Sequence, residues 1–434
     1  MRELTVLVIA VAIAVLAGAG TASAAPVPRV ERVVPLEADP ALEAPGVFFR
    51  EGFETIQNLK EQFPDTAEGV GKFTVTGTDP FSGKRSLEQA YIGRDHYQEA
   101  DKGSAGWVAR FFGDSPLFAS RIADKTQQRR IYARWYHKLP EGFDAMVDGK
   151  VHFPPKMARI SCIDKDWNKV YSVLFWIENG PEARISIERH TKAPGVHREW
   201  LPNSAAAFAC GEAINIGRWV QMEMAVILGD GPRSDRVMAW ADGKLICDVK
   251  NDDLAAGWKG LGLTDMMWDC YWNEGSPRDQ SRFYDDLALS NKGPIGPART
   301  GVNPEILLTA GAEKPPMWEV EVAEGAQQPL QPARMVDGVP IRYQPVALQC
   351  TTVWKSKAAG ASRVKVDATS GEFTGPRAGQ AGLAENTMHF VRVRAQDQAG
   401  AWSEWSDWHA GFATTWKAGA TAEEKTLPRG FLAE

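Results

Sequence analysis

The chain is built largely from short runs of alternating apolar and polar residues that are separated by turn-forming residues. The clearest signal runs from Trp240 to Leu245, where Asp242-Gly243 is typical of a two-residue turn between antiparallel strands. Further runs cover Arg130–Lys138, Lys169–Ile177, Ala183–His190 and Trp219–Leu228, whereas a helical pattern occurs only briefly near Thr55–Gln62. Runs of this length and spacing predict an all-β sandwich rather than alternating strand–helix units.

Proline- and glycine-rich stretches divide the chain into domains. The stretch Gly293–Pro297 closes the first set of strands, and a connector containing Lys314-Pro315-Pro316 follows it. We predict a signal peptide at 1–24, a flexible lead-in at 25–45, a two-sheet antiparallel jelly roll at 46–297, a linker at 298–316, a small β-sandwich at 317–416 and a disordered tail at 417–434.

The first residues predict export. Arg2 precedes an apolar run from Leu4 to Leu16, and Ala22-Ser23-Ala24 forms a cleavage site. The protein is therefore expected to be secreted or periplasmic, without stable membrane insertion after cleavage. A retained membrane anchor is the alternative, although the apolar run is short for a membrane span.

Composition narrows the functional classes. A net charge of −6 argues against a general nucleic-acid binder. The 16 tryptophans suit a protein that stacks on sugar rings, but large β-cores use tryptophan too. The five cysteines fit no metal-ligand spacing; one or two disulfides are expected among Cys162, Cys210, Cys247 and Cys270, with Cys350 a buried free thiol.

The C-terminal part contains the strand His389–Arg394, a glycine-containing turn, and then Trp402-Ser403-Glu404-Trp405-Ser406. This hairpin resembles the last two strands of a fibronectin type III domain, which implies a spacer or binding accessory. Arg392 and Arg394 share one strand face, so their guanidinium groups are expected to stack on neighbouring indoles. The alternative is an exposed tryptophan ladder that grips glycan.

Four segments of the large domain carry a second resemblance. They are Phe49–Glu54, Pro80–Leu87, Trp240–Lys244 and Phe283–Leu289. In order and content they resemble the concanavalin A-like jelly rolls of the alginate and glucuronan lyase type. The resemblance implies a polysaccharide lyase. The chain departs from that group at 150–157, which reads KVHFPPKM where many members have Gly-Gly-Lys-Leu-Pro-Gly.

Breaking a uronate polymer by β-elimination needs a group that neutralises the carboxylate, a base for the C5 proton and an acid for the leaving oxygen. The run 132–138 places Tyr132, Arg134, Tyr136 and Lys138 on one face, which we interpret as a cleft for an acidic sugar. A solvated outer face is the alternative. We predict that Arg134 neutralises the carboxylate and that Tyr136 or His152 takes the proton. Lys156 and Arg159 are expected to assist, and no cofactor is needed for catalysis.

Two more polar stripes are candidates for substrate binding. One comprises Arg184, Glu188 and His190, and the other Gln221 and Glu223. If their strands are neighbours, the stripes would form one groove with the face of Arg134. Glu188 and Glu223 have a rival interpretation as the carboxylate pair of a glycoside hydrolase.

The aromatic group Trp268, Tyr271 and Trp272 has two interpretations. Trp272 is predicted to bind substrate as part of a sugar-stacking platform, and a small satellite core is the alternative. A structural calcium ion is a separate expectation. Glu54 lies near the first strand and Asp285 and Asp286 near the last, where hard oxygen ligands could join the two.

The sequence thus predicts a secreted carbohydrate-active protein, foremost a polysaccharide lyase whose partner is an acidic polysaccharide. A non-catalytic glycan-binding or adhesion protein on the same scaffold is the alternative, and a glycoside hydrolase ranks third.

Overall fold

The computed structural model describes residues 28–433 with internal gaps. The gaps are 69–70, 94–105, 119, 121, 123–124, 145–154, 179–183, 193–205, 214–215, 259, 273–274, 311–314, 331–333, 337–338 and 344. Only the backbone is described for 178, 184, 206–213, 334–336 and 339–343. The predicted signal peptide and His152 lie outside the described residues, and the side chain of Cys210 is not described. No helix among the described residues is long and apolar enough to cross a membrane.

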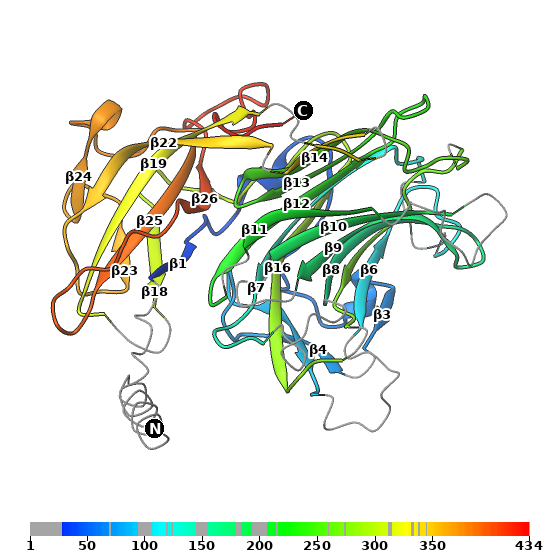
Figure 1. Cartoon of the computed structure of the whole chain (residues 1–434), viewed down its shortest axis with the longest axis horizontal. Helices are drawn as coiled ribbons and strands as arrows, with labels where there is room; N and C mark the ends of the chain where they lie inside the picture. Colours follow the sequence, from blue (N-terminus) through cyan, green and yellow to red (C-terminus); the bar gives the residue numbers. More distant parts are fainter. Residues whose placement is uncertain are drawn as a thin grey trace, which may run out of the picture.

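The large domain consists of two stacked antiparallel sheets, as predicted (Figure 1). The seven-stranded sheet has the order β11 (Ala206–Ala213), β10 (Arg184–Thr191), β9 (Lys169–Glu178), β8 (Lys156–Ile163), β15 (Asp265–Asp269), β6 (Trp107–Phe111) and β3 (Asp65–Ala67). The predicted short helix is a single turn, α2 (Leu59–Gln62).

The ten-stranded sheet packs against it. Its order is β20 (Arg334–Val336), β21 (Val339–Tyr343), β14 (Lys244–Asp252), β13 (Asp235–Ala241), β12 (Trp219–Ile227), β7 (Arg130–Lys138), β16 (Gln280–Ser290), β5 (Ser86–Tyr91) and β4 (Gly71–Thr76), with β2 (Val47–Glu51) also paired to β16. Asp242 and Gly243 both have positive φ in the predicted turn between β13 and β14, a conformation that this type of hairpin turn requires.

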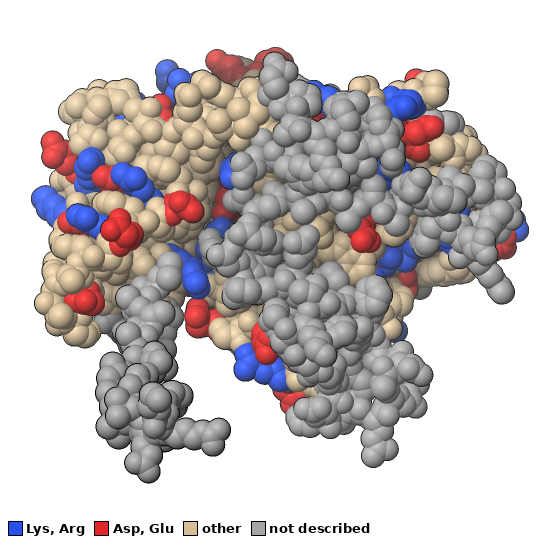
Figure 2. Space-filling view, viewed as in Figure 1, with Lys and Arg blue, Asp and Glu red and all other residues tan. Residues whose placement is uncertain are grey.

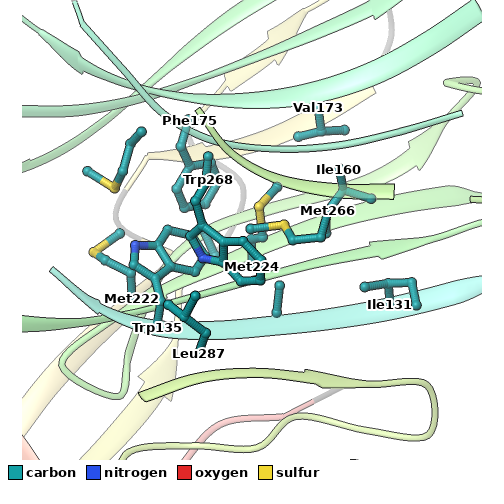
Figure 3. Close-up of a cluster of buried hydrophobic side chains, with 14 of the residues drawn as sticks. Ile131, Trp135, Ile160, Val173, Phe175, Met222, Met224, Met266, Trp268 and Leu287 are labelled. Atoms are coloured by element: carbon teal, nitrogen blue, oxygen red, sulfur yellow. The ribbon is translucent and has the colours of Figure 1, made fainter. Parts of the chain in front are cut away.

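The core lies between these two sheets and follows from the alternation of each strand. Figure 3 shows Trp135 of β7 beside Trp268 of β15, with Met222 and Met224 of β12 and Phe175 of β9 around them. All five side chains are buried. Burying side chains of this size stabilises each by roughly 2–3 kcal/mol, so the inward face of every strand is fixed by the hydrophobic effect.

The C-terminal part is a second, smaller sandwich that lies beside the first (Figure 1). Its six-stranded sheet has the order β17 (Arg299–Thr300), β26 (His409–Thr414), β25 (Met388–Gln396), β19 (Met317–Pro329), β22 (Val346–Ser356) and β24 (Gly371–Phe373). Its three-stranded sheet has the order β1 (Arg29–Val33), β18 (Glu305–Thr309) and β23 (Arg363–Lys365). Its assignment to the fibronectin type III class remains a prediction.

Three predicted boundaries are wrong. The lead-in contains β1, which pairs with β18 and buries Val30 in the core of the small sandwich. The linker contains β17 and β18. The tail is packed: Phe431 stacks on Trp240 of the large domain, and the Trp240 Nε1 donates to the carbonyl of Leu432 at 2.9 Å.

The predicted stacking of arginines on indoles is confirmed. Arg394 lies over the rings of Trp402 and Trp405 at 5.0 and 4.9 Å. Arg392 lies over Trp405 and Trp408 at 4.8 and 4.6 Å, and it also pairs with Glu321. Because the arginines occupy the indole faces, this arrangement favours a role in stabilising the domain over a role in binding glycan. On the face shown in Figure 2, basic and acidic side chains of this domain are intermixed.

The four cysteines whose side chains are described are free thiols, so the predicted disulfides among Cys162, Cys247 and Cys270 are wrong. Each of these three is buried in the core of the large sandwich. Cys350 is free as predicted, but it is half-buried rather than buried.

Candidate functional site

The face of β7 that carries Arg134 is buried, so it does not form the predicted cleft. The Arg134 side chain has no exposed surface, and its Nη1 donates to Asp39 Oδ2 at 2.7 Å. Asp39 begins η1 (Pro40–Glu43), in the segment predicted to be a flexible lead-in. Tyr136 is buried too; its hydroxyl accepts a hydrogen bond from the Ala298 N–H at 2.7 Å. Burial raises the pKa of Tyr136, which is the wrong direction for a base.

The other predicted residues of this sheet are structural as well. Glu223 accepts from the N–H groups of Ile295 and Gly296 at 2.7 and 2.9 Å. Gln221 accepts from the Gly243 N–H at 2.8 Å. Two further members of the predicted cleft are held by tertiary contacts: Lys138 pairs with Glu31 and Asp79, and Tyr132 packs with Trp240 and Val346.

The three polar stripes do not share a groove. The stripes of Arg134 and Gln221 lie on the ten-stranded sheet, whereas Glu188 and His190 lie on β10 of the opposite sheet. The hydrolase interpretation of Glu188 with Glu223 fails for the same reason, because the hydrophobic core separates the two carboxylates.

Lys156, Arg159, Glu188 and His190 are brought together on the outer face of the seven-stranded sheet, by which we mean the face turned away from the core. Register aligns them in cross-strand rows. Lys156 lies opposite Trp176 of β9, which lies opposite Ser186 of β10. The next row joins Arg159, Leu174 and Glu188, and the third joins Ser161, Ser172 and His190.

Lys156 is held between two aromatic rings. Its Nζ lies 5.1 Å from the centroid of the Trp176 ring and 4.5 Å from that of Tyr271. Burial lowers the pKa of Lys156 to about 8; Asp269 opposes this shift and Arg159 adds to it. A lysine in this state has an appreciable neutral fraction near pH 8, so its amine can accept a proton.

Arg159 forms the charged centre of the same face. Its Nη2 lies 2.5 Å from Asp269 Oδ2 and 2.9 Å from Met267 Sδ, while its buried Nε has no hydrogen-bond partner among the described residues. The Asp269 side chain is 1% exposed. The Asp269 carboxylate thus orients the Arg159 guanidinium, which keeps 12% of its side chain exposed.

Two groups of opposite charge, Asp265 and Lys169, interact at the other end of the face. Asp265 of β15 accepts a hydrogen bond from the Ser161 hydroxyl at 2.8 Å. Burial raises the pKa of Asp265 and lowers the pKa of Lys169, which interacts electrostatically with it. His190 Nε2 lies 3.1 Å from Glu188 Oε2. The face therefore combines cations, carboxylates and aromatic rings within a few strands.

The remaining predicted substrate residues divide between the core and this face. Trp272 is fully buried in the core together with Trp268, so the platform interpretation is wrong for it. Its neighbour Tyr271 is half-buried beside Lys156. Arg184 lies on β10 in the strand position expected for the outer face, although its side chain is not described.

The residues predicted to hold calcium lie together at one turn. Asp285 Oδ2 accepts from the N–H groups of Phe81 and Ser82, and Asp286 Oδ1 accepts from the Ser82 hydroxyl. Glu54 Oε1 accepts from the N–H of Lys84 at 2.8 Å. Within the described ranges, no group of three or more acidic, histidine or cysteine side chains is arranged to hold a metal ion. A calcium ion here remains a prediction.

Lys169, Trp176, Asp265 and Asp269 were not predicted as site residues. Lys169 faces outward because a bulge between Cys162 and Ile163 changes the alternation of β9. Trp176 alternates with core residues of β9 and could have been assigned by the same period-2 argument that placed Glu188.

No known protein family matches the sequence, and no curated protein matches it. Among solved structures, it is similar to an alginate lyase from a Chlorella virus, with 13% identity, a TM-score of 0.41, and coverage of 56% of this chain and 99% of that chain. It is similar to an endo-β-1,4-glucuronan lyase from Trichoderma reesei at 12% identity and a TM-score of 0.39, covering 57% and 96%. The globular domain of T. cruzi calreticulin is similar at 11% identity and a TM-score of 0.33, covering 57% and 88%. At these values the similarities carry no argument about activity.

Proposed function

We propose that this chain is a polysaccharide lyase that cleaves a uronate-containing glycan by β-elimination on the outer face of the seven-stranded sheet. The observation that carries the proposal is Lys156, an amine with a lowered pKa that is held between two aromatic rings beside Arg159. A buried lysine beside a second cation is a base poised near neutral pH, and the same cations attract an acidic polymer.

Each step has a residue for it. Arg159 binds the uronate carboxylate and so makes the C5 proton more acidic. The neutral amine of Lys156 takes that proton, and the C4–O bond breaks as the C4=C5 double bond forms. Tyr271, whose ring lies 4.5 Å from the Lys156 amine, donates the proton to the leaving oxygen. Trp176 is buried, and its ring holds the Lys156 amine in place from the other side. These proton transfers and bond changes account for the whole reaction, so it requires no electron donor, metal or cofactor.

The signal peptide predicted at 1–24 supports action outside the cytoplasm, where polysaccharide substrates are found. We therefore propose a secreted or periplasmic enzyme whose partner is an acidic polysaccharide. The small sandwich then serves as a spacer or accessory module.

The test is the ultraviolet absorbance of the unsaturated uronic product, with alginate, glucuronan and other acidic polymers as substrates. Lys156→Met should lower the rate by about a hundredfold or more, as loss of a general base does. Its melting temperature should not fall, because burial already disfavours the charged form of this lysine. Lys165→Ala, in the exposed turn after β8, is the matched control and should retain activity.

A non-catalytic glycan-binding protein is the second candidate. It is favoured by the ion pair Arg159–Asp269, which neutralises part of the charge on the face. Binding of an acidic polymer without any unsaturated product, measured by calorimetry and absorbance on the same sample, would establish this second function and exclude the first.

A further inference from the structure

A buried arginine in the core of the large sandwich has no negative partner among the described residues. Arg282 of β16 has no exposed surface, and its guanidinium lies 5.4 Å from the ring of Tyr91 and 5.5 Å from that of Tyr284. Its Nη2 donates to the backbone carbonyl of Asp269 at 3.3 Å. Its Nε and Nη1 have no hydrogen-bond partner in the described part of the chain. An arginine stays charged at any pH a protein experiences, so a positive charge is buried here.

The neighbouring groups do not supply the missing negative charge. The Tyr91 hydroxyl donates to the Cys270 carbonyl at 2.9 Å, and the Tyr284 hydroxyl donates to the Met157 carbonyl at 3.1 Å. Burial raises the pKa values of both tyrosines and of the Cys270 thiol, so all three are neutral near pH 7. A buried charge without a counter-charge is strongly unfavourable, which points to a partner that the described residues do not supply.

A histidine beside the arginine has unpaired nitrogens as well. His137 of β7 lies directly opposite Tyr284 in the sheet, and their ring centroids are 5.0 Å apart. Neither ring nitrogen of His137 has a hydrogen-bond partner among the described residues, and the side chain is fully buried. In neutral imidazole one nitrogen carries a proton, so the histidine adds an unpaired donor in the same part of the core, where it interacts electrostatically with Arg282.

We propose that the core of the large sandwich holds a small inorganic anion, chloride, beside β7 and β16. The anion would accept hydrogen bonds from Arg282 Nε and Nη1 and from the N–H of His137. The unpaired arginine nitrogens are all donors, and an anion accepts from every one of them. A water molecule could accept only part of this set and would leave the positive charge uncompensated. The anion therefore replaces the carboxylate that accompanies Arg134 and Arg159 elsewhere in the molecule.

Chloride that binds only to the folded chain must raise its melting temperature. In sodium chloride exchanged for sodium gluconate at constant ionic strength, the melting temperature should rise by roughly 3 to 6 °C per tenfold increase in chloride once binding is saturating. Arg282→Met should abolish this dependence without lowering the melting temperature in gluconate, because an apolar residue of similar size removes the uncompensated charge. An identical melting temperature in both salts would overturn the proposal.

Arg110→Met is the matched control. Arg110 is a half-buried arginine that lies over the ring of Phe49 and donates to the Gln62 carbonyl, so its replacement should keep the chloride dependence. If Arg110→Met also lost the dependence, the effect would be general rather than site-specific, and the proposal would fall. The unaltered chain gives an independent test: crystals soaked in bromide should show an anomalous peak within hydrogen-bond distance of Arg282 Nε. A water-like peak with no anomalous signal, or no peak, would refute it.

Discussion

Arg134 and Arg159 occupy comparable places on the two sheets of one sandwich, yet their surroundings differ completely. Both alternate with core residues and both pair with an aspartate, at 2.7 and 2.5 Å. Arg134 is covered by Asp39, Gly296 and Tyr136, and its side chain has no exposed surface. Arg159 lies beside a lysine with a lowered pKa and is 12% exposed. The first arginine anchors chain segments, and the second is the arginine that we propose binds a substrate.

The difference comes from segments that are remote in sequence. The face of Arg134 is crossed by η1 and by residues 295–298, whose backbone groups bond to Arg134, Glu223 and Tyr136. These contacts bury the face of Arg134 under segments that precede or follow the strands of the large sandwich. A polar stripe on a strand therefore identifies an outward face, but the rest of the fold decides whether that face is a site or an interface.

The largest expected effect is on the buried pair. Asp39→Ala should lower the free energy of unfolding by about 3–5 kcal/mol, because it leaves Arg134 charged and uncompensated. Glu43→Ala is the control; its pair with Arg50 is exposed and should contribute less than about 1 kcal/mol. Denaturant unfolding measures both. Equal losses in the two variants would contradict the anchoring role of Arg134.

The next largest effect is the contribution of Glu223 to the free energy of unfolding, which depends on pH. Burial raises the pKa of Glu223 to about 7, although the N–H groups of Ile295 and Gly296 oppose the shift. Because the folded state holds the proton more tightly than the unfolded state, this group's stability contribution is greatest below pH 4.5. It is lost as pH rises towards 7, by up to about 3 kcal/mol.

Glu223→Gln should remove this dependence, so the stability difference between variant and wild type should change with pH by about that amount. Denaturant unfolding at pH 4.5 and 7.5 measures it. Exposed Glu372→Gln is the control and should follow the wild type at both values. A constant difference between Glu223→Gln and wild type would show that the carboxylate is not strained by burial.

The outer face of the seven-stranded sheet should show a pH dependence of rate rather than of stability. If Lys156 is the base, elimination should rise with pH and level off near 8, with about a tenfold loss for each pH unit below that value. Initial rates across pH 5.5–9 measure this. A profile that is flat from pH 6 to 9 would exclude Lys156 as the base while leaving the lyase activity itself intact.

We expect the smallest effect from calcium removal. Asp285 and Asp286 already accept hydrogen bonds from Phe81 and Ser82, and these bonds hold the turn without an ion. Excess chelator should therefore lower the melting temperature by less than about 3 °C, corresponding to under about 1 kcal/mol. A larger fall that calcium alone reverses would instead establish a stabilising ion between the first and last strands.

The sequence was sufficient for the fold class and for which residues share a strand face. Period-2 alternation correctly placed Tyr132, Arg134, Tyr136 and Lys138 together, because burial of Trp135 dictates the opposite face. It could not show that Asp39 and Gly296 cover them, since contacts 95 and 162 residues apart leave no local pattern. Lys169 was missed because its orientation depends on a bulge. Lys156 and Arg159 were identified as site residues, but they were expected to assist Arg134, which lies on the opposite sheet.

The pairing of β1 with β18 also affects when each sandwich can fold during synthesis. Arg29 lies opposite Thr309, so the first strand to leave the ribosome waits 280 positions for its partner. The small sandwich is therefore completed last and by both ends of the chain. A C-terminal fragment starting at residue 298 would lack β1, so the edge of β18 that pairs with β1 would be exposed. Cleavage after Ala24 would release an N-terminus only four residues before β1, whereas an uncleaved signal would tether this sandwich directly to the membrane.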